Sequence, residues 1–298
     1  MKTAFALTQR NVKLFFKDKG MFLVSLITPV ILIVLYVTFL GNVYRNSFLA
    51  TFPTGITIEE SVINGYVGGQ LISSILAVSC VTVAFCSNMI MIQDKSNGVI
   101  KDITIAPVKG SALAISYYFS ALFSTLIVCV TALGLCLGYV GIIGWYIRPV
   151  DIALLILDVV LLTTFGTALS SIINFFLSTQ GQMSAVGTIV SSGYGYICGA
   201  YMPLSQFPEG LRKVISFLPG TYGTSLVRNH AMAGVIEEME SNGIPEEIIT
   251  SLRDAIDCNL YFFGERVSIG SMYVILVTAV ILLIALYIGM NAIKLKRK

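Results

Sequence analysis

Six long apolar stretches constrain this chain more than any other feature of its sequence. They lie at 20–40, 62–92, 111–140, 152–177, 183–202 and 269–290. About 20 consecutive apolar residues are enough for a helix to cross the roughly 30 Å hydrocarbon core of a bilayer. With 56% hydrophobic and 12% charged residues, a soluble globule of this chain would expose too much apolar surface. We therefore predict an all-α membrane protein with six transmembrane helices.

The placement of Lys and Arg predicts which side of the membrane each connection faces. Most of the 19 basic residues lie before residue 20, between 93 and 110, or after 293. Only Asp18, Asp94 and Asp102 bring acidic charge to these regions, whereas the connection 235–267 is rich in Glu and Asp. Because basic residues gather in cytoplasmic connections, we predict a multi-pass protein of the cell membrane with both termini cytoplasmic. Basic clusters beside membrane helices favour contact with anionic membrane lipids, and we expect no nucleic-acid partner.

Residues 1–19 form an amphipathic pattern before the first apolar stretch. Helical spacing puts an apolar or weakly polar set on one face and a basic set on another: Phe5, Thr8, Val12, Phe15 and Phe16 against Arg10, Lys13 and Lys17. Such a helix lies along the membrane interface rather than crossing it. Two interpretations stay open: the helix only anchors the chain to lipid, or it also packs on a cytoplasmic subunit.

A charged segment, QDKSNGVIKDITIAPVKG at 93–110, separates the second and third apolar stretches. Pro107 disfavours helical structure at Ala106, so we expect a short element that stops there and is stiff enough to transmit a rigid-body movement. An ordinary basic cytoplasmic loop is the alternative.

No motif in the sequence indicates catalysis. The loop G-x-x-x-x-G-K-[ST], which cradles the phosphates of ATP, does not occur. His230, the single histidine, has no Cys or carboxylate at ligand spacing, and no Ser, His and Asp arrangement suggests hydrolysis. We therefore expect no catalytic residue, metal site or cofactor in this chain. Energy has to come from a partner or from a gradient.

The connection YMPLSQFPEGLRKVISFLPGTYGTSLVR, from residue 201, is broken by Pro203, Pro208 and Pro219. We expect 203–234 to form short helices that enter the outer leaflet and return, which is tolerated where protein buries them. A helix lying on the surface is the alternative. Pro245 predicts the start of a further helix, so the acidic stretch 235–267 is expected to form a small external cap.

Polar side chains inside the apolar stretches predict the lining of a translocation pathway, because each is costly against lipid. The candidates are mainly in the second and fifth stretches: Gln70, Ser73, Ser74, Asn88, Thr188, Ser191, Ser192, Tyr194 and Tyr196. Hydroxyl groups mixed with aromatic rings suit an amphiphilic cargo, and interhelical hydrogen bonding without cargo contact is the alternative for each. Asp158, the one carboxylate well inside an apolar stretch, is a further candidate. It has to be protonated, hydrated or paired, and we favour a structural or cargo-contact role over a proton relay.

The amphipathic arm, the segment 93–110 and the connection from residue 201 together resemble the type 2 permeases of ABC transporters, over nearly the whole chain. The resemblance implies a single permease domain, 1–298, with a cytoplasmic coupling helix within 93–110 and external re-entrant helices. It also implies a second copy of this chain or a similar permease, and two cytoplasmic ABC ATPase subunits that hold ATP and magnesium. The residues expected to couple to the ATPase are Arg10, Lys13, Lys17, Asp94, Lys95, Lys101, Asp102 and Pro107.

These features predict the membrane subunit of an ATP-driven exporter for amphiphiles such as drugs, antibiotics, peptides or lipid-like molecules. A polysaccharide or other polymer exporter is the alternative within this class. Outside it, the alternatives are a gradient-driven secondary carrier and a structural membrane partner. Carriers built of inverted repeats have related halves with helices broken at matching places, and no such symmetry is visible here. The chain itself is not expected to be an enzyme.

Overall fold

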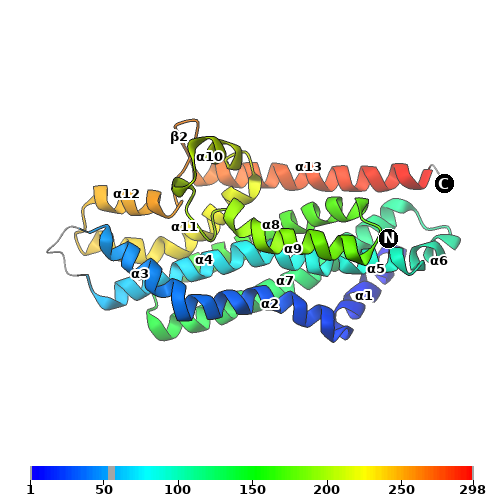
Figure 1. The fold of residues 1–298 in the computed structure, drawn as a ribbon, viewed down its shortest axis with the longest axis horizontal. Helices are drawn as coiled ribbons and strands as arrows, with labels where there is room; N and C mark the ends of the chain where they lie inside the picture. The colour runs from blue at the N-terminus through cyan, green and yellow to red at the C-terminus, as the bar shows by residue number, and fades with distance from the viewer. Residues whose placement is uncertain (1, 53–57, 297–298) are drawn as a thin grey trace.

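The computed structural model describes residues 2–52 and 58–296, with side chains as far as residue 293. The basic side chains expected at 294–298 lie outside this description. Most of the described chain is helical, and the helices run along one long axis (Figure 1). The first helices are α1 (Lys2–Lys17), α2 (Lys19–Leu35), the π turn η1 (Tyr36–Leu40), α3 (Gly41–Ala50), α4 (Glu60–Ser87), α5 (Met89–Ser96), α6 (Val99–Ile105) and α7 (Gly110–Ile143).

The second half of the chain adds six helices, a 3-10 turn and a hairpin. They are α8 (Pro149–Phe176), α9 (Gln180–Ile197), the 3-10 turn η2 (Leu204–Gln206), α10 (Glu209–Ile215), α11 (Pro219–Ser241), α12 (Glu246–Ala255), β1 (Leu260–Phe262), β2 (Glu265–Val267) and α13 (Ile269–Lys296). The strands β1 and β2 pair antiparallel and form the one sheet of the described chain.

Five helical stretches of the described chain are long and apolar enough to cross a membrane. They are Lys19–Ala50 (α2, η1 and α3), Glu60–Ser96 (α4 and α5), Gly110–Ile143 (α7), Pro149–Phe176 (α8) and Ile269–Ile293 (most of α13). The chain is therefore a helical multi-pass membrane protein, as predicted. The six-span count is not reproduced, because α9 stands where a crossing at 183–202 was expected. Its Gln, Gly, Ser and Thr residues keep its mean hydropathy low.

Helix α4 is the central helix of the bundle. Within its most apolar window, 89% of the residues are buried, and it packs against α2, α7, α8, α9 and α11. Close approach to α8 depends on Gly166, where a Cβ atom would lie 2.7 Å from the carbonyl oxygen of Cys80. By contrast, α2 and α13 bury only about a fifth of their apolar windows, 22% and 17%. Their outer faces are available to lipid or to another protein chain.

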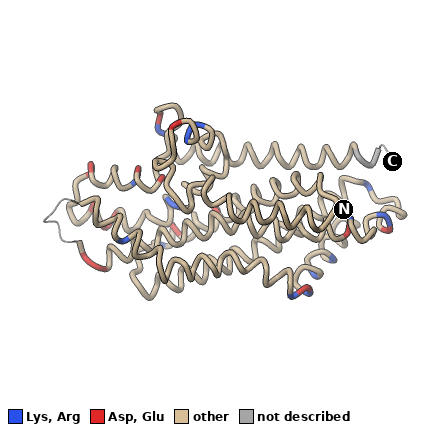
Figure 2. Tube along the Cα trace, in the orientation of Figure 1, with Lys and Arg blue, Asp and Glu red and all other residues tan. Residues whose placement is uncertain are grey.

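The two ends of the bundle differ in the elements they carry. Helices α1 and α6 and the end of α13 lie at one end, which we call the coupling end after the role expected of 93–110 from the sequence, and α3 and α12 lie at the other (Figure 1). Charged residues gather at both ends and on a side projection, and few lie along the stretch between (Figure 2). A long, weakly charged middle with charged ends is the pattern expected of a membrane protein.

The region expected to hold short re-entrant helices contains one long buried helix. Each of its helices begins directly after a proline or with one: α10 follows Pro208 and α11 starts at Pro219. Helix α11 continues without a break to Ser241, so the division expected at residue 235 falls inside it. It is largely buried because it packs along α4, α8 and α13. The helix expected after Pro245 is α12, whose Ile249 and Leu252 pack against α11.

Candidate functional site

At the coupling end, Asp94 of α5 joins three helices. Arg10 of α1 donates two hydrogen bonds to its carboxylate, Nη1 to Oδ2 at 2.7 Å and Nη2 to Oδ1 at 3.1 Å. The Tyr117 hydroxyl of α7 donates to Oδ2 at 2.6 Å. Asp94 is only 5% exposed, and a two-pronged guanidinium contact of this kind is both strong and directional. We call these three residues the Asp94 node.

The neighbouring residue Lys95 ties α5 to the end of α8. Its ammonium Nζ donates to the carbonyl oxygens of Asn174 at 2.7 Å, Phe175 at 3.0 Å and Leu177 at 3.0 Å. The last carbonyl groups of a helix have no partner within the helix and carry partial negative charge, so a lysine is well matched to this position. Asn88, at the break between α4 and α5, also reaches α8 by donating to the Ser171 hydroxyl at 3.1 Å.

Helix α6 is the exposed part of the segment 93–110. Gly98 turns the chain with a φ of +79° between α5 and α6, a conformation that favours glycine. The helix ends at Ile105, and Ala106 is extended, which confirms the stop predicted from Pro107. Lys101 and Asp102 are exposed, and the Ile105 side chain is 85% exposed.

The eight residues expected to couple to an ATPase fall into two groups. Three make contacts within this chain: Arg10, Asp94 and Lys95. The other five are exposed on α1, on α6 or just after α6: Lys13, Lys17, Lys101, Asp102 and Pro107.

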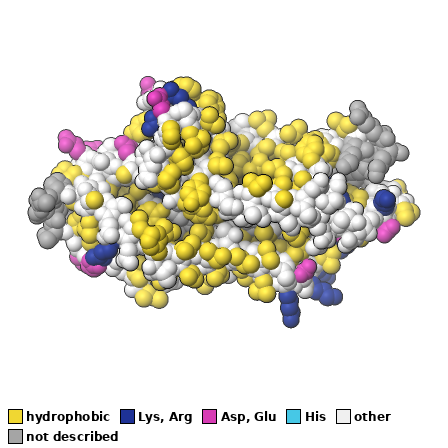
Figure 3. Space-filling view, viewed as in Figure 1, with side chains coloured by type: hydrophobic (Ala, Val, Ile, Leu, Met, Phe, Trp, Pro, Cys, Tyr) yellow, Lys and Arg dark blue, Asp and Glu magenta, His cyan; other side chains and the backbone are white. Residues whose placement is uncertain are grey.

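A large groove runs between α2 and α9. Its volume is about 1320 Å³, and the wall contributed by α2 is mainly aliphatic, with Ile27, Ile31 and Leu35 among its residues. The opposite wall, on α9, presents the hydroxyl groups of Ser184, Thr188, Ser191 and Ser192 and the ring of Tyr196. Apolar side chains cover much of the face on which α2 and α9 lie (Figure 3). The groove therefore has one apolar and one hydroxyl-rich side.

The predicted pathway residues divide between this groove and the interior of the bundle. Thr188, Ser191, Ser192 and Tyr196 line the groove. The other candidates do not line it: Gln70, Ser73, Ser74, Asn88 and Asp158 are buried, and Tyr194 lies against Gly220 of α11. Several of the buried ones are held by contacts inside this chain, as Ser74 is by donating to the Ala200 carbonyl at 2.8 Å. Gln70, Ser73 and Ser74 do not reach the groove because the middle of α4 is buried.

Asp158 has partners that could not be identified from the sequence. The Tyr273 hydroxyl of α13 donates to Oδ1 at 2.6 Å, and Nδ1 of His230, from α11, lies 2.6 Å from Oδ2. Asp158 is 1% exposed. The carboxylate therefore connects α8, α11 and α13 inside the bundle, and its structural or cargo-contact role stays a prediction. His230 could have been recognised as a partner only if α11 had been expected at membrane depth.

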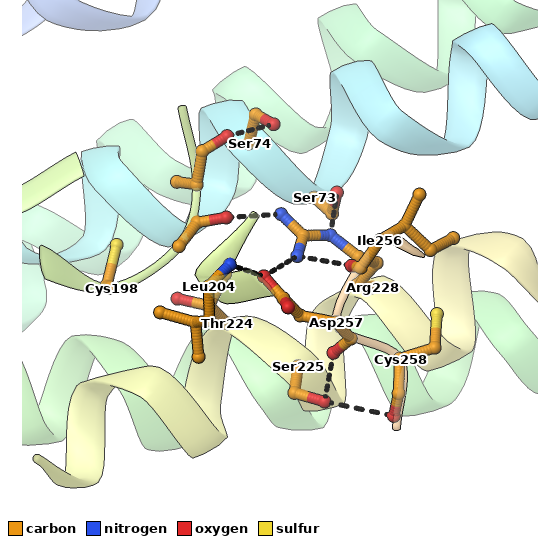
Figure 4. Close-up of polar contacts among 12 residues, drawn as sticks. Ser73, Ser74, Cys198, Leu204, Thr224, Ser225, Arg228, Ile256, Asp257 and Cys258 are labelled. Atoms are coloured by element: carbon orange, nitrogen blue, oxygen red, sulfur yellow. Dashed lines mark hydrogen bonds and ion pairs between the residues drawn. The ribbon is translucent and has the colours of Figure 1, made fainter. Parts of the chain in front are cut away.

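A second buried polar cluster surrounds Arg228 of α11 and was not anticipated (Figure 4). The guanidinium donates to the carbonyl oxygens of Ile256 at 2.6 Å and Gly199 at 2.8 Å, and its Nη1 lies 3.6 Å from the Asp257 carboxylate. Asp257 also accepts from the Leu204 amide at 2.8 Å. Arg228 is 3% exposed. The cluster fastens the backbone of Ile256, the side chain of Asp257 and the turn after α9 to α11.

Burial has an electrostatic consequence at Asp257, which lies outside the membrane-spanning stretches. Loss of hydration raises the pKa of its carboxyl group to about 6, from 3.8, although Arg228 and the Leu204 amide act in the opposite direction. The backbone of Asp257 has a φ of +56°, which is uncommon for a residue with a side chain. The residue type at position 257 is therefore constrained both by the contacts of its carboxylate and by its backbone conformation.

Comparison with known proteins identifies the family. A family model described as ABC-2 type transporter matches residues 3–231, which include the Asp94 node, most of the groove lining and Arg228. The searches of curated proteins and of solved structures each gave no match. Because the family model covers most of the chain, this protein belongs to the ABC-2 type transporter family and is a membrane permease of an ABC transporter.

Proposed function

We propose that this permease is the membrane subunit of an ATP-driven exporter that moves amphiphilic molecules outward. In this proposal two permease chains, both copies of this one or one of them a similar chain, work with two cytoplasmic ATPase subunits that bind ATP and magnesium. The coupling end, with α1, α6 and both termini, faces the cytoplasm, as the basic residues of the sequence predict. The α3 and α12 end faces outward.

The groove between α2 and α9 is the observation that carries the proposal. Its aliphatic wall suits the apolar part of a cargo, and the hydroxyl groups on α9 suit a polar part. A second permease chain set against this face encloses the groove between the two chains. The apolar wall favours an amphiphile, such as a drug, a peptide or a lipid-like molecule, over a polysaccharide, whose hydroxyl groups would face aliphatic side chains without partners.

The coupling end supports a route by which an ATPase could move this groove. The exposed α6, with Lys101, Asp102 and Ile105, is the proposed docking element, and Lys13 and Lys17 on α1 are the second contact. Movement of α6 passes to α5. From α5 the Asp94 node carries it to α1 and α7, and Lys95 carries it to the turn between α8 and α9. The wall of the groove contributed by α9 is thereby connected to the docking element.

Charge reversal on α6 tests the docking step. The double variant Lys101→Glu with Asp102→Lys keeps the net charge and changes two exposed side chains, so the permease should fold normally. We expect it to lose co-purification with an ATPase subunit and to lose export. The matched control is Glu247→Lys on α12, at the other end, which should change neither. Normal ATPase recovery and export in the α6 variant would show that α6 is not the docking element.

Narrowing the groove tests the pathway separately. Thr188→Leu and Ser191→Leu replace hydroxyl groups with larger apolar side chains on the groove wall. These variants should still bind the ATPase but should export a bulky amphiphile poorly. Depleting ATP while keeping the ion gradients should abolish export by the unaltered protein. Continued export after ATP depletion would support a gradient-driven carrier instead.

A further inference from the structure

A side projection stands out from the bundle at the outer end of α13. It consists of α10 with residues 216–218 and the hairpin 260–267, and it lies beside the first turns of α13 (Figure 1). Since α13 begins its apolar run at Ile269, only one residue after β2 ends, the hairpin stands where a membrane-spanning helix begins. The projection is therefore at the level of the membrane surface opposite the coupling end.

Exposed aromatic and aliphatic side chains cover part of this projection. Phe263 at the tip of the hairpin is 68% exposed, and Phe217 and Val214 are each 62% exposed. Phe217 packs edge-on against Phe262 and Phe263, with ring centroids 5.2 and 6.1 Å apart. Aromatic side chains at this level of a membrane protein insert at the boundary between head groups and acyl chains. The projection consequently has an apolar surface placed for contact with lipid.

Behind the aromatic residues lies a pocket of about 600 Å³, lined by Glu209, Arg212 and Lys213 on α10 and by Asp254 and Asp257 on the cap. Arg212 is on the α10 wall. Its guanidinium makes no hydrogen bond or ion pair in the part of the chain that the structure describes, whereas its neighbour Lys213 is paired with Glu209 at 2.6 Å. The carboxylates of Asp254 and Asp257 are on the cap wall. Charged side chains of both signs are gathered on the projection (Figure 3).

A carboxylate on the cap wall is held in place by its neighbours. Asn259 lines the pocket and is 4% exposed. Its Nδ2 donates to Asp254 Oδ1 at 2.7 Å, and the Tyr261 hydroxyl donates to the same oxygen at 3.1 Å. A ligand that brings a cationic N–H group would neutralise the carboxylate of Asp254.

We propose that this pocket binds the head group of an outer-leaflet phospholipid that carries a primary amine. Arg212 holds the phosphate, the Asp254 carboxylate accepts hydrogen bonds from the ammonium group, and the acyl chains leave along the exposed aromatic residues. An ammonium group has three N–H donors, whereas a quaternary choline has none. The acceptors on the cap wall therefore select ethanolamine over choline, and Arg212 together with the carboxylates selects a zwitterion over an anionic glycerol head group.

Lipid retention measured by mass spectrometry of the intact protein tests this site. Lipids with matched acyl chains and ethanolamine, choline or glycerol head groups are offered to the unaltered protein and to two variants. Arg212→Gln removes the phosphate contact, and Arg266→Gln removes a nearby arginine that does not line the pocket. We expect Arg212→Gln to reduce ethanolamine-lipid retention about tenfold relative to Arg266→Gln, as for the loss of one charge-assisted contact. Equal retention by the two variants, or equal retention of all three lipids, would overturn the assignment.

Two further arms identify the source of the ligand and its amine. Asp254→Asn should abolish the preference for ethanolamine over choline. Hydrogen exchange of the amides in the hairpin 260–267 serves as the control that the cap of this variant is still folded against the bundle. If the cap is folded and the preference is unchanged, the assignment of the site is wrong. Soluble phosphoethanolamine should displace the lipid only weakly, since it lacks acyl chains. Displacement at equal concentration would mean that the pocket takes a soluble zwitterion, and the lipid assignment would then be wrong.

Discussion

Breaking the Asp94 node should loosen α1 by an amount that the structure allows us to work out. The two variants are Arg10→Gln and Asp94→Asn. In the unaltered protein a nearly buried carboxylate accepts two hydrogen bonds from Arg10 and one from Tyr117. Removing one partner of a buried ion pair costs about 3 to 5 kcal/mol. The Arg10 side chain is 34% exposed, so solvent screening lowers the expected cost to about 2 kcal/mol.

The double variant distinguishes this ion pair from two independent contacts. Once Asp94→Asn has removed the charge, Arg10→Gln no longer strands a buried carboxylate. We therefore expect the double variant to cost about 1 to 2 kcal/mol less than the sum of the single variants. A single-variant loss of about 2 kcal/mol corresponds to a roughly 30-fold increase in the opening equilibrium of α1.

Hydrogen exchange of the α1 amides is the appropriate assay, because it reports the free energy of local opening. Lys13→Gln is the matched control: Lys13 is an exposed basic residue on the same helix, and its replacement should leave exchange unchanged. If the two single-variant effects add to within about 0.5 kcal/mol, or if Lys13→Gln has the same effect as Arg10→Gln, the coupling assigned to the node is refuted.

Three other predictions concern the interior and the cap. Burial raises the pKa of Asp257 from 3.8 to about 6. The protonated carboxyl group of Asp257 therefore stabilises the folded cap, and this stabilisation is complete below about pH 4. This stabilisation, about 3 kcal/mol in total, is lost as pH rises through 6. Hairpin amide protection, corrected for intrinsic exchange, should fall over this range, and Asp257→Asn should remove the dependence. Asp158→Asn should lower thermal stability by about 2 kcal/mol yet leave the proposed export activity of the folded variant intact; loss of export from a folded variant would instead support a proton relay through Asp158. Gly166→Ala should cost about 2 kcal/mol or more in unfolding experiments, since its Cβ would meet the α4 backbone, whereas Gly187→Ala on α9, with open space around it, should cost nothing.

Local signals in the sequence predicted two boundaries correctly. Helix α6 ends before Pro107, and α12 begins directly after Pro245. Proline fixes its own φ and lacks an N–H group, so it acts on its immediate neighbours. Its effect on a helix boundary can therefore be predicted without knowing the fold. The hydroxyl groups of α9 that line the groove were named as pathway candidates from their own helix alone, and their role in transport stays a prediction.

The partners of buried charges could not be predicted in the same way. Arg10 and Asp94 are 84 positions apart, and Asp158 and His230 are 72 positions apart. Helical periodicity tells which face a residue occupies but not which helix lies opposite. The burial of α11 could not be predicted either. Its Arg, His, Ser and Thr residues give it the composition of a surface segment. They are buried only because α4, α8 and the cap provide partners.

The contrast between α4 and α9 has a consequence for how this permease can evolve. Most substitutions in α4 disturb close packing on every side and reduce folding stability. Most of the groove wall on α9, by contrast, is formed by side chains with few contacts inside this chain. Under the proposed function, in which this groove holds the cargo, substitutions there change which molecules are accepted without reducing the yield of folded protein. Selection for a new cargo can therefore act on α9 without loss of folding. We expect sequence variation among related chains to be concentrated on α9, whereas the sequence of α4 should stay nearly constant.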